Sequence, residues 1–98
     1  MVKHIILWKL KENLTDKDSV KKGIKEGLEG LAGKIPGLQD IHVYTEPLEG
    51  SSADVMLDST FADLESLKGY RTHPAHVAVA DTYVRPFTEI RLCINREA

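Results

Sequence analysis

The sequence contains a single cysteine, Cys93, so it cannot form an intrachain disulfide or a C-x-x-C redox or zinc motif. Its 15 acidic and 13 basic side chains give a net charge of −2, which supplies no electrostatic footprint for nucleic acid. The apolar run Ile5–Trp8 ends at Lys9 and is too short for a signal peptide or a membrane span. We therefore expect a cytoplasmic protein that binds neither nucleic acid nor membranes.

Features that hold cofactors are also missing. No glycine-rich phosphate loop follows a predicted strand, because Gly27, Gly30 and Gly33 fall inside or at the end of a predicted helix. The four histidines are scattered and do not form a zinc signature. We expect neither a cofactor nor a metal ion.

The length of 98 residues, with 42% hydrophobic and 29% charged side chains, indicates one folded domain over residues 1–98. Alternating apolar residues predict strands, and apolar residues at spacings of three and four predict helices. The expected strands are 2–10, 38–45, 53–60 and 87–95. The expected helices are a long one from Thr15 to Ile35, one over 62–71 and a short one over 74–82.

The order β-α-β-β-α-β predicts an α+β, ferredoxin-like fold, in which both crossover helices lie on the same side of a four-stranded antiparallel sheet. If His4, Ile6 and Trp8 face the helices, Ile5 and Leu7 point to the uncovered side. Because a twofold interface uses one apolar patch twice, we expect a homodimer through this face. The alternative is a monomer in which lysine stems shield the sheet.

The most unusual cluster is Tyr70–His76, which holds two of the four histidines and one of the three tyrosines. A neutral imidazole at His76 suits a general base, and a phenol at Tyr70 can stabilise a developing enolate oxygen. His73 is more simply a helix cap, and His76 is as readily a structural histidine as a base. His4 either shares a cavity with His76 or is a satisfied core histidine.

Three motifs carry a family resemblance: Val2–Ile6 at the start, Ile35–Leu38, and Tyr70-x-x-His73-Pro74-x-His76. Together they resemble the stress-responsive dimeric α/β-barrel (Dabb) family. The resemblance implies a ferredoxin-like subunit whose sheet pairs with that of a second copy to form a barrel. In plant polyketide cyclases of this type, the residues matching His76 and Tyr70 catalyse ring closure, and the histidine matching His4 lies in the same cavity.

These observations leave two functions open. The protein is either a cofactor-independent cyclase or lyase acting on a small apolar carbonyl compound, or a ligand-binding or stress-associated module without turnover. In the first case His76 and Tyr70 are catalytic, and the residues expected to contact the substrate are His4, Ile6, Trp8, Leu28 and His73. The cyclases line their cavity with aromatic side chains on the first helix, where this chain has Leu28, and Trp8 could narrow or fill the space.

Overall fold

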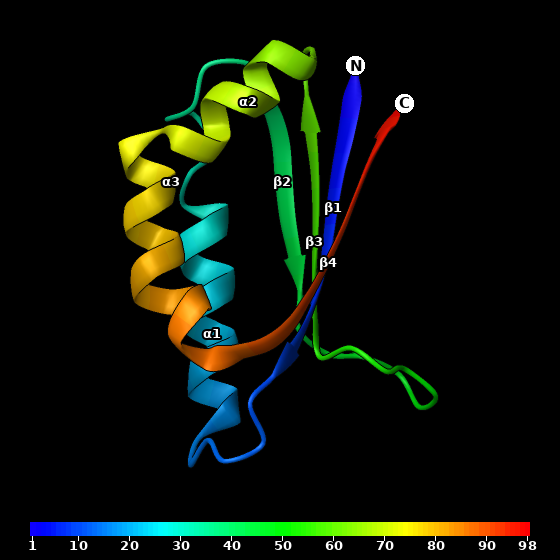
Figure 1. Ribbon diagram of the computed structural model, residues 1–98, viewed down its shortest axis with the longest axis vertical. Coiled ribbons are helices and arrows are strands. Elements are labelled where there is room, and N and C mark those ends of the chain that lie inside the picture. The colour runs from blue at the N-terminus through cyan, green and yellow to red at the C-terminus, as the bar shows by residue number, and fades with distance from the viewer.

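The computed structural model describes all 98 residues and shows a four-stranded sheet with helices on one face (Figure 1). The strands are β1 (Val2–Leu10), β2 (Leu38–Tyr44), β3 (Val55–Phe61) and β4 (Thr88–Glu97), and the α-helices are α1 (Lys17–Glu29), α2 (Leu64–Thr72) and α3 (Pro74–Val79). The sheet order is β2-β3-β1-β4, and every neighbouring pair is antiparallel. The expected ferredoxin-like α+β fold is confirmed.

The core lies between the sheet and the helices. Alternate β1 residues, among them His4, Ile6 and Trp8, are buried on the helix-facing side, as the period of two predicts. Leu57 and Phe61 of β3 complete this surface and are fully buried. Burying such apolar side chains contributes roughly 1.5–3 kcal/mol each, which holds the helical layer on the sheet.

The boundaries of α1 differ from the expectation at both ends. The N-cap is Asp16 rather than Thr15, and its carboxylate accepts a hydrogen bond from the Ser19 amide at 3.0 Å. The helix ends at Glu29 rather than near Ile35, and residues 30–35 form turns. Leu31 and Ile35 are nevertheless buried, so the apolar spacing reflects their burial in the core and does not require them to be helical.

Gly37 directly precedes β2 and packs closely against the first turn of α2. Its φ of +83° is a left-handed conformation that favours glycine, and a Cβ there would lie 2.1 Å from Ser66 Oγ. The Gly37 carbonyl accepts a hydrogen bond from the Ala62 amide at 2.8 Å. This close approach sets the position of α2.

The short helix expected over 74–82 begins as α3, and the chain then continues through two helical turns that differ from an α-helix. A π-helical turn covers Ala80–Val84, and a 3-10 turn covers Arg85–Phe87. α1 can approach this segment because Gly27 has no side chain: a Cβ there would lie 3.0 Å from Val79 and 3.2 Å from Tyr83. Turns of the π type are frequent at functional sites, and this one buries Ala80 and Val84.

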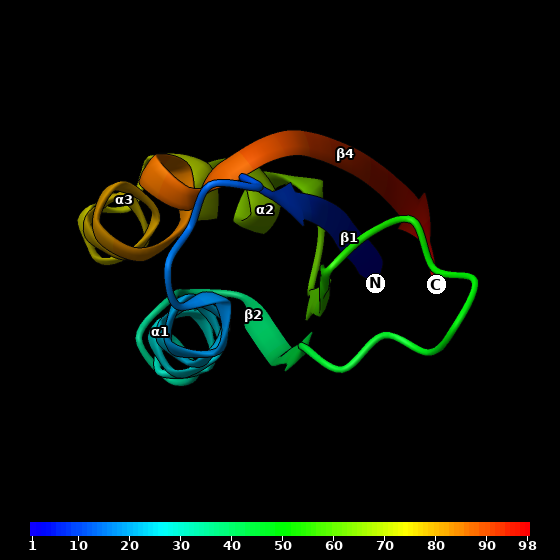
Figure 2. The same cartoon turned by 90° about the horizontal axis from the view of Figure 1, so that it is seen from below.

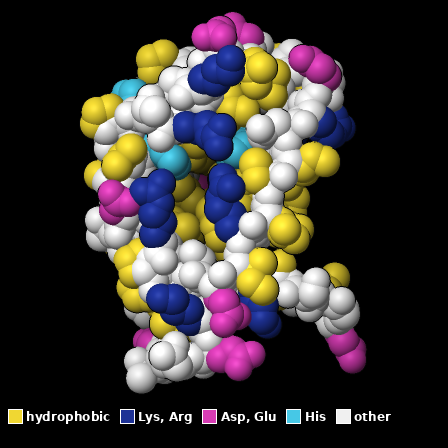
Figure 3. All heavy atoms as spheres, in the orientation of Figure 1, with side chains coloured by type: hydrophobic (Ala, Val, Ile, Leu, Met, Phe, Trp, Pro, Cys, Tyr) yellow, Lys and Arg dark blue, Asp and Glu magenta, His cyan; other side chains and the backbone are white.

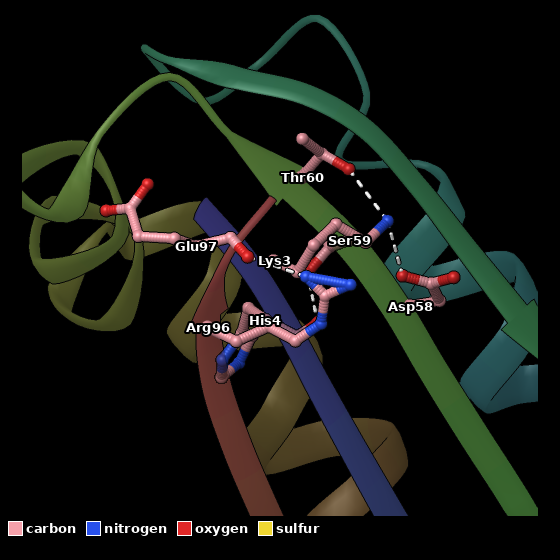
Figure 4. Close-up of polar contacts among 7 residues, drawn as sticks. All are labelled: Lys3, His4, Asp58, Ser59, Thr60, Arg96 and Glu97. Carbon is pink, nitrogen blue, oxygen red and sulfur yellow. Dashed lines mark hydrogen bonds and ion pairs between the residues drawn. The ribbon is translucent and has the colours of Figure 1, made fainter. Parts of the chain in front are cut away.

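The second face of the sheet is uncovered (Figure 2). Apolar side chains remain exposed there, with Leu92 63%, Ile94 59%, Ile90 47% and Leu7 37% accessible. Beside them, Lys3 of β1 contacts two side chains of β3: its Nζ lies 2.7 Å from Asp58 Oδ1 and 2.9 Å from Thr60 Oγ1 (Figure 4). An apolar strip of this kind is typical of an interaction surface. None of the helices has the length and hydrophobicity needed to cross a lipid bilayer.

Candidate functional site

A cavity of about 320 Å³ lies between the sheet and the helical layer, within the range of small-molecule sites. Its opening is visible as a hollow in Figure 3, with histidines on either side. Six residues singled out from the sequence line it, from four different elements: His4, Ile6, Trp8, Leu28, Tyr70 and His76. The fold therefore brings together one helix residue from α1, one each from α2 and α3, and three from β1.

Tyr70, in the second turn of α2, is the most deeply placed polar residue of the cavity. Its side chain is only 1% exposed, and its hydroxyl is buried without any hydrogen-bond partner. Burial raises the pKa of this phenol above its usual value, so the hydroxyl keeps its proton. A buried hydroxyl without a partner is costly, and a ligand with an acceptor oxygen would satisfy it.

His76, on α3, packs against Tyr70. The Nδ1 atom of its half-buried imidazole lies 3.3 Å from the Arg71 carbonyl oxygen. Because a carbonyl only accepts, Nδ1 carries the proton and Nε2 keeps its lone pair. Burial lowers the pKa of His76 from its ordinary value; the hydrogen bond to the Arg71 carbonyl opposes this effect, and the positive charges of Arg85 and Arg91 add to it. At neutral pH this imidazole is uncharged and can accept a proton at Nε2.

His4, from β1, also packs against Tyr70, with ring centroids 6.0 Å apart and an edge-to-face arrangement. It is 2% exposed, and its Nδ1 lies 2.6 Å from Asn95 Oδ1 of the neighbouring strand. Desolvation lowers its pKa, against the opposing effect of the Asn95 hydrogen bond. His4 therefore lines the cavity and is at the same time hydrogen-bonded to a side chain of β4.

The apolar side chains make walls but do not fill the cavity. Trp8 is 4% exposed and borders the space together with Ile6 and Leu28. Phe87 does not line this cavity and borders a different surface groove beside Tyr83. An opening therefore reaches Tyr70 and His76.

His73 is not brought to this cavity. It is the N-cap of α3, and its Nδ1 accepts a hydrogen bond from the Ala75 amide at 3.1 Å. His73 is therefore not among the residues that line the cavity with Tyr70 and His76. The intervening Pro74 starts a new helix, so His73 and His76 point to different volumes although they are one turn apart.

Sequence reasoning missed several polar residues around the cavity. Asn95 was not singled out, because the register that places it opposite His4 comes from β1–β4 pairing. Arg71, Arg85 and Arg91 also line the site. The alternation of β4 could have indicated Arg91, since it lies on the side opposite the exposed Ile90.

Two observations concern reactive or metal-binding groups. Cys93 is exposed, and its Sγ lies 3.7 Å from His4 Nδ1. No three His, Cys, Asp or Glu side chains lie close enough together to hold a metal ion.

The chain is similar to several known proteins. Olivetolic acid cyclase from Cannabis sativa is 30% identical over 91 residues, which cover 90% of this chain and 87% of the cyclase. A dimeric protein of unknown function and ferredoxin-like fold from Bacteroides fragilis is 33% identical, with a TM-score of 0.90 and coverage of 99% of this chain and 95% of that one. Hydroxynitrile lyase from Passiflora edulis shares the fold, with a TM-score of 0.71, 18% identity and coverage of 97% of this chain and 90% of the lyase.

The model of the stress responsive A/B barrel domain family, Dabb, matches residues 2–98. This match agrees with the order of elements, the sheet topology and the motif that runs from Tyr70 to His76. The resemblance recognised in the sequence is thereby confirmed, and the chain belongs to the Dabb family.

Proposed function

We propose that this protein is a cofactor-independent acid/base catalyst that removes a proton from the carbon next to a carbonyl group of a small substrate. His76 Nε2 is the general base, and the Tyr70 hydroxyl donates a hydrogen bond to the carbonyl oxygen. His4 helps to orient the substrate from the opposite wall. Two similar proteins are named as a cyclase and a lyase, which agrees with this general class of reaction.

The protonation states of the three side chains suit this division of roles. A base must be neutral at the working pH, and the lowered pKa values of His76 and His4 keep both imidazoles neutral near pH 7. The donor must keep its proton, and the raised pKa of Tyr70 ensures this. When the base takes the proton, negative charge develops on the carbonyl oxygen, where the Tyr70 hydroxyl would stabilise it.

The single observation that carries the proposal is that Tyr70, whose buried hydroxyl has no hydrogen-bond partner, lines the same open cavity as His76. A phenol kept only for packing would be replaced without loss by phenylalanine, because its hydroxyl gains nothing from the protein. The adjacent imidazole, with ring centroids 4.1 Å apart, makes the same volume suitable for proton transfer.

Deuterium exchange tests this proposal without knowledge of the natural substrate. We expect the protein to exchange the acetyl protons of acetophenone with D2O near neutral pH, followed by proton NMR, at a rate about 10² to 10⁴ above an equal concentration of free imidazole. The Tyr70→Phe and His76→Gln variants should lose this acceleration. The matched control is Tyr83→Phe, because Tyr83 is 44% exposed and packs on α1 outside the cavity.

If the wild-type protein binds acetophenone but does not exchange its protons, the non-catalytic ligand-binding module is favoured. Exchange that persists in both the Tyr70→Phe and His76→Gln variants would contradict the assigned roles.

The quaternary arrangement that we propose is a homodimer formed through the uncovered sheet face. The similar Bacteroides fragilis protein is described as dimeric. Here the exposed side chains of Leu92, Ile94 and Ile90 form an apolar strip on β4, next to Leu7 of β1. Covering this strip with a second copy would remove it from water, and the partly buried Lys3–Asp58 pair would lie at its side.

A further inference from the structure

The cavity carries a charge that its apolar walls do not explain. Among its lining residues are three arginines, Arg71, Arg85 and Arg91, and no aspartate or glutamate. They come from three separate elements: the last turn of α2, the 3-10 turn and β4. Lys and Arg side chains surround the hollow in Figure 3. This concentration is local, because the whole chain has a net charge of −2.

Two of the three guanidinium groups have no partner of opposite charge. Arg85 is paired with Asp81 one turn earlier, whereas neither Arg71 nor Arg91 takes part in any ion pair. Like charges that converge on one space repel each other, and an anion placed between them would relieve this repulsion. Arginine is also the residue best suited to bind carboxylate or phosphate oxygens in pairs.

The cavity is graded in polarity with depth. Tyr70 and His4 are almost completely buried, whereas all three arginines are exposed at the rim. A bound molecule would therefore meet the phenol and imidazole groups with one end and the guanidinium groups with the other. Ile6, Trp8 and Leu28 would contact the apolar part in between.

From this arrangement we infer that the substrate is a small carbonyl compound with an anionic oxygen group, a carboxylate or a phosphate, that binds to Arg91 and Arg71 at the cavity mouth. The inference rests on the proposed function of Tyr70 and His76 and narrows its substrate class. It replaces the sequence-based expectation of a small apolar carbonyl compound with a carbonyl compound that is apolar in the middle and charged at one end.

Matched probes of nearly equal shape test the inference by calorimetry or NMR titration. The probes are 3-acetylbenzoate, its neutral analogue 3-acetylbenzamide and 3-acetylphenyl phosphate. We expect at least one of the two anions to bind about tenfold or more tightly than the amide at low salt, a difference typical of a charge-assisted hydrogen bond. The anion that binds more tightly identifies the group the site prefers, and the preference should shrink as salt is added.

Variants assign the effect to the cavity mouth. Arg91→Gln should remove most of the preference for the anion, because it weakens binding of the anion far more than binding of the amide. The matched control is Arg96→Gln, because Arg96 is on the same strand with its side chain on the opposite face of the sheet. Equal affinities for anion and amide, failure of both anions to bind, or an equal loss in Arg96→Gln would overturn the inference.

The outcome separates this inference from the proposed function. Neutral acetophenone exchange that depends on Tyr70 and His76, combined with equal affinity for anion and amide, would refute only the anionic substrate class. A preference for the anion that Arg91→Gln removes, without proton exchange, would refute the catalytic roles and leave an anion-binding cavity.

Discussion

The rings of Tyr70 and His76 lie 4.1 Å apart between centroids, with an angle of 38° between their planes. This contact uses the faces of the rings, and the hydrogen bond of His76 uses Nδ1. It therefore engages neither the Tyr70 hydroxyl nor His76 Nε2 in a hydrogen bond. Side-chain packing thus orients the two groups without using the atoms that chemistry needs.

Removal of the Tyr70 hydroxyl separates function from stability. Tyr70→Phe deletes a buried polar group that has no partner, so we expect the free energy of unfolding to stay the same or to rise by up to about 1 kcal/mol. Proton exchange should fall by about 10²-fold, as for loss of a donor to a developing oxyanion. Urea unfolding and the exchange assay measure the two effects. A destabilised variant with full exchange activity would contradict the account.

The two histidines of the motif should behave differently. His76→Ala should abolish exchange and lower the free energy of unfolding by about 1–3 kcal/mol, because it removes a partly buried hydrogen-bonding group. His73→Ala should lower it by about 1 kcal/mol through loss of the α3 cap and leave exchange intact. If His76→Ala does not fold, His76→Gln provides the test. Loss of exchange in His73→Ala would place that residue in the site after all.

Stability should depend on pH in the range where the buried imidazoles titrate. The folded pKa values of His4 and His76 lie below the ordinary 6.5, mainly because of desolvation, so the unfolded chain binds protons more readily. Stability is therefore complete above about pH 6.5 and decreases as the pH falls toward the folded pKa values. Urea unfolding at pH 7.5 and 5.5 should show this loss.

The double variant His4→Gln, His76→Gln should have a smaller loss of stability between these two pH values. The carboxyl groups with altered pKa values act in another range, because those of Glu29 and Asp63 are lowered from 4.5 and 3.8 and affect stability only at more acid pH. If the double variant loses as much stability between the two pH values as the wild-type protein, other groups cause the acid sensitivity.

Local patterns were sufficient for the fold and for part of the site. The alternation in β1 correctly separated His4, Ile6 and Trp8 from Ile5 and Leu7, because a strand has only two faces. Helix ends were less predictable, since Leu31 and Ile35 are buried in turns and have the same spacing as helical residues.

Contacts between segments that are distant in the sequence could not be predicted from these local patterns. The Asn95 partner of His4 and the convergence of Arg71 with Arg91 follow from strand register and from the position of α2. The cap role of His73 was foreseen, but the different directions of His73 and His76 depend on the break between α2 and α3.

A single substitution tests the proposed dimer interface. Leu92→Lys places a charge in the centre of the exposed apolar strip, and we expect it to convert a dimer to a monomer on a sizing column with light scattering. The control is Leu64→Lys, because Leu64 is 50% exposed at the start of α2 and lies outside this face. A wild-type protein that is monomeric, or a Leu92→Lys variant that stays dimeric, would contradict the proposed interface.

The most direct measurement of the central claim is the tautomer of His76 in the resting protein, from long-range ¹H–¹⁵N NMR correlations assigned by comparison with His76→Gln. The account predicts a neutral ring at pH 7 with its proton on Nδ1 and a free lone pair on Nε2. A ring protonated on Nε2, or a doubly protonated imidazolium at this pH, would contradict it, because neither form can accept the substrate's proton at Nε2.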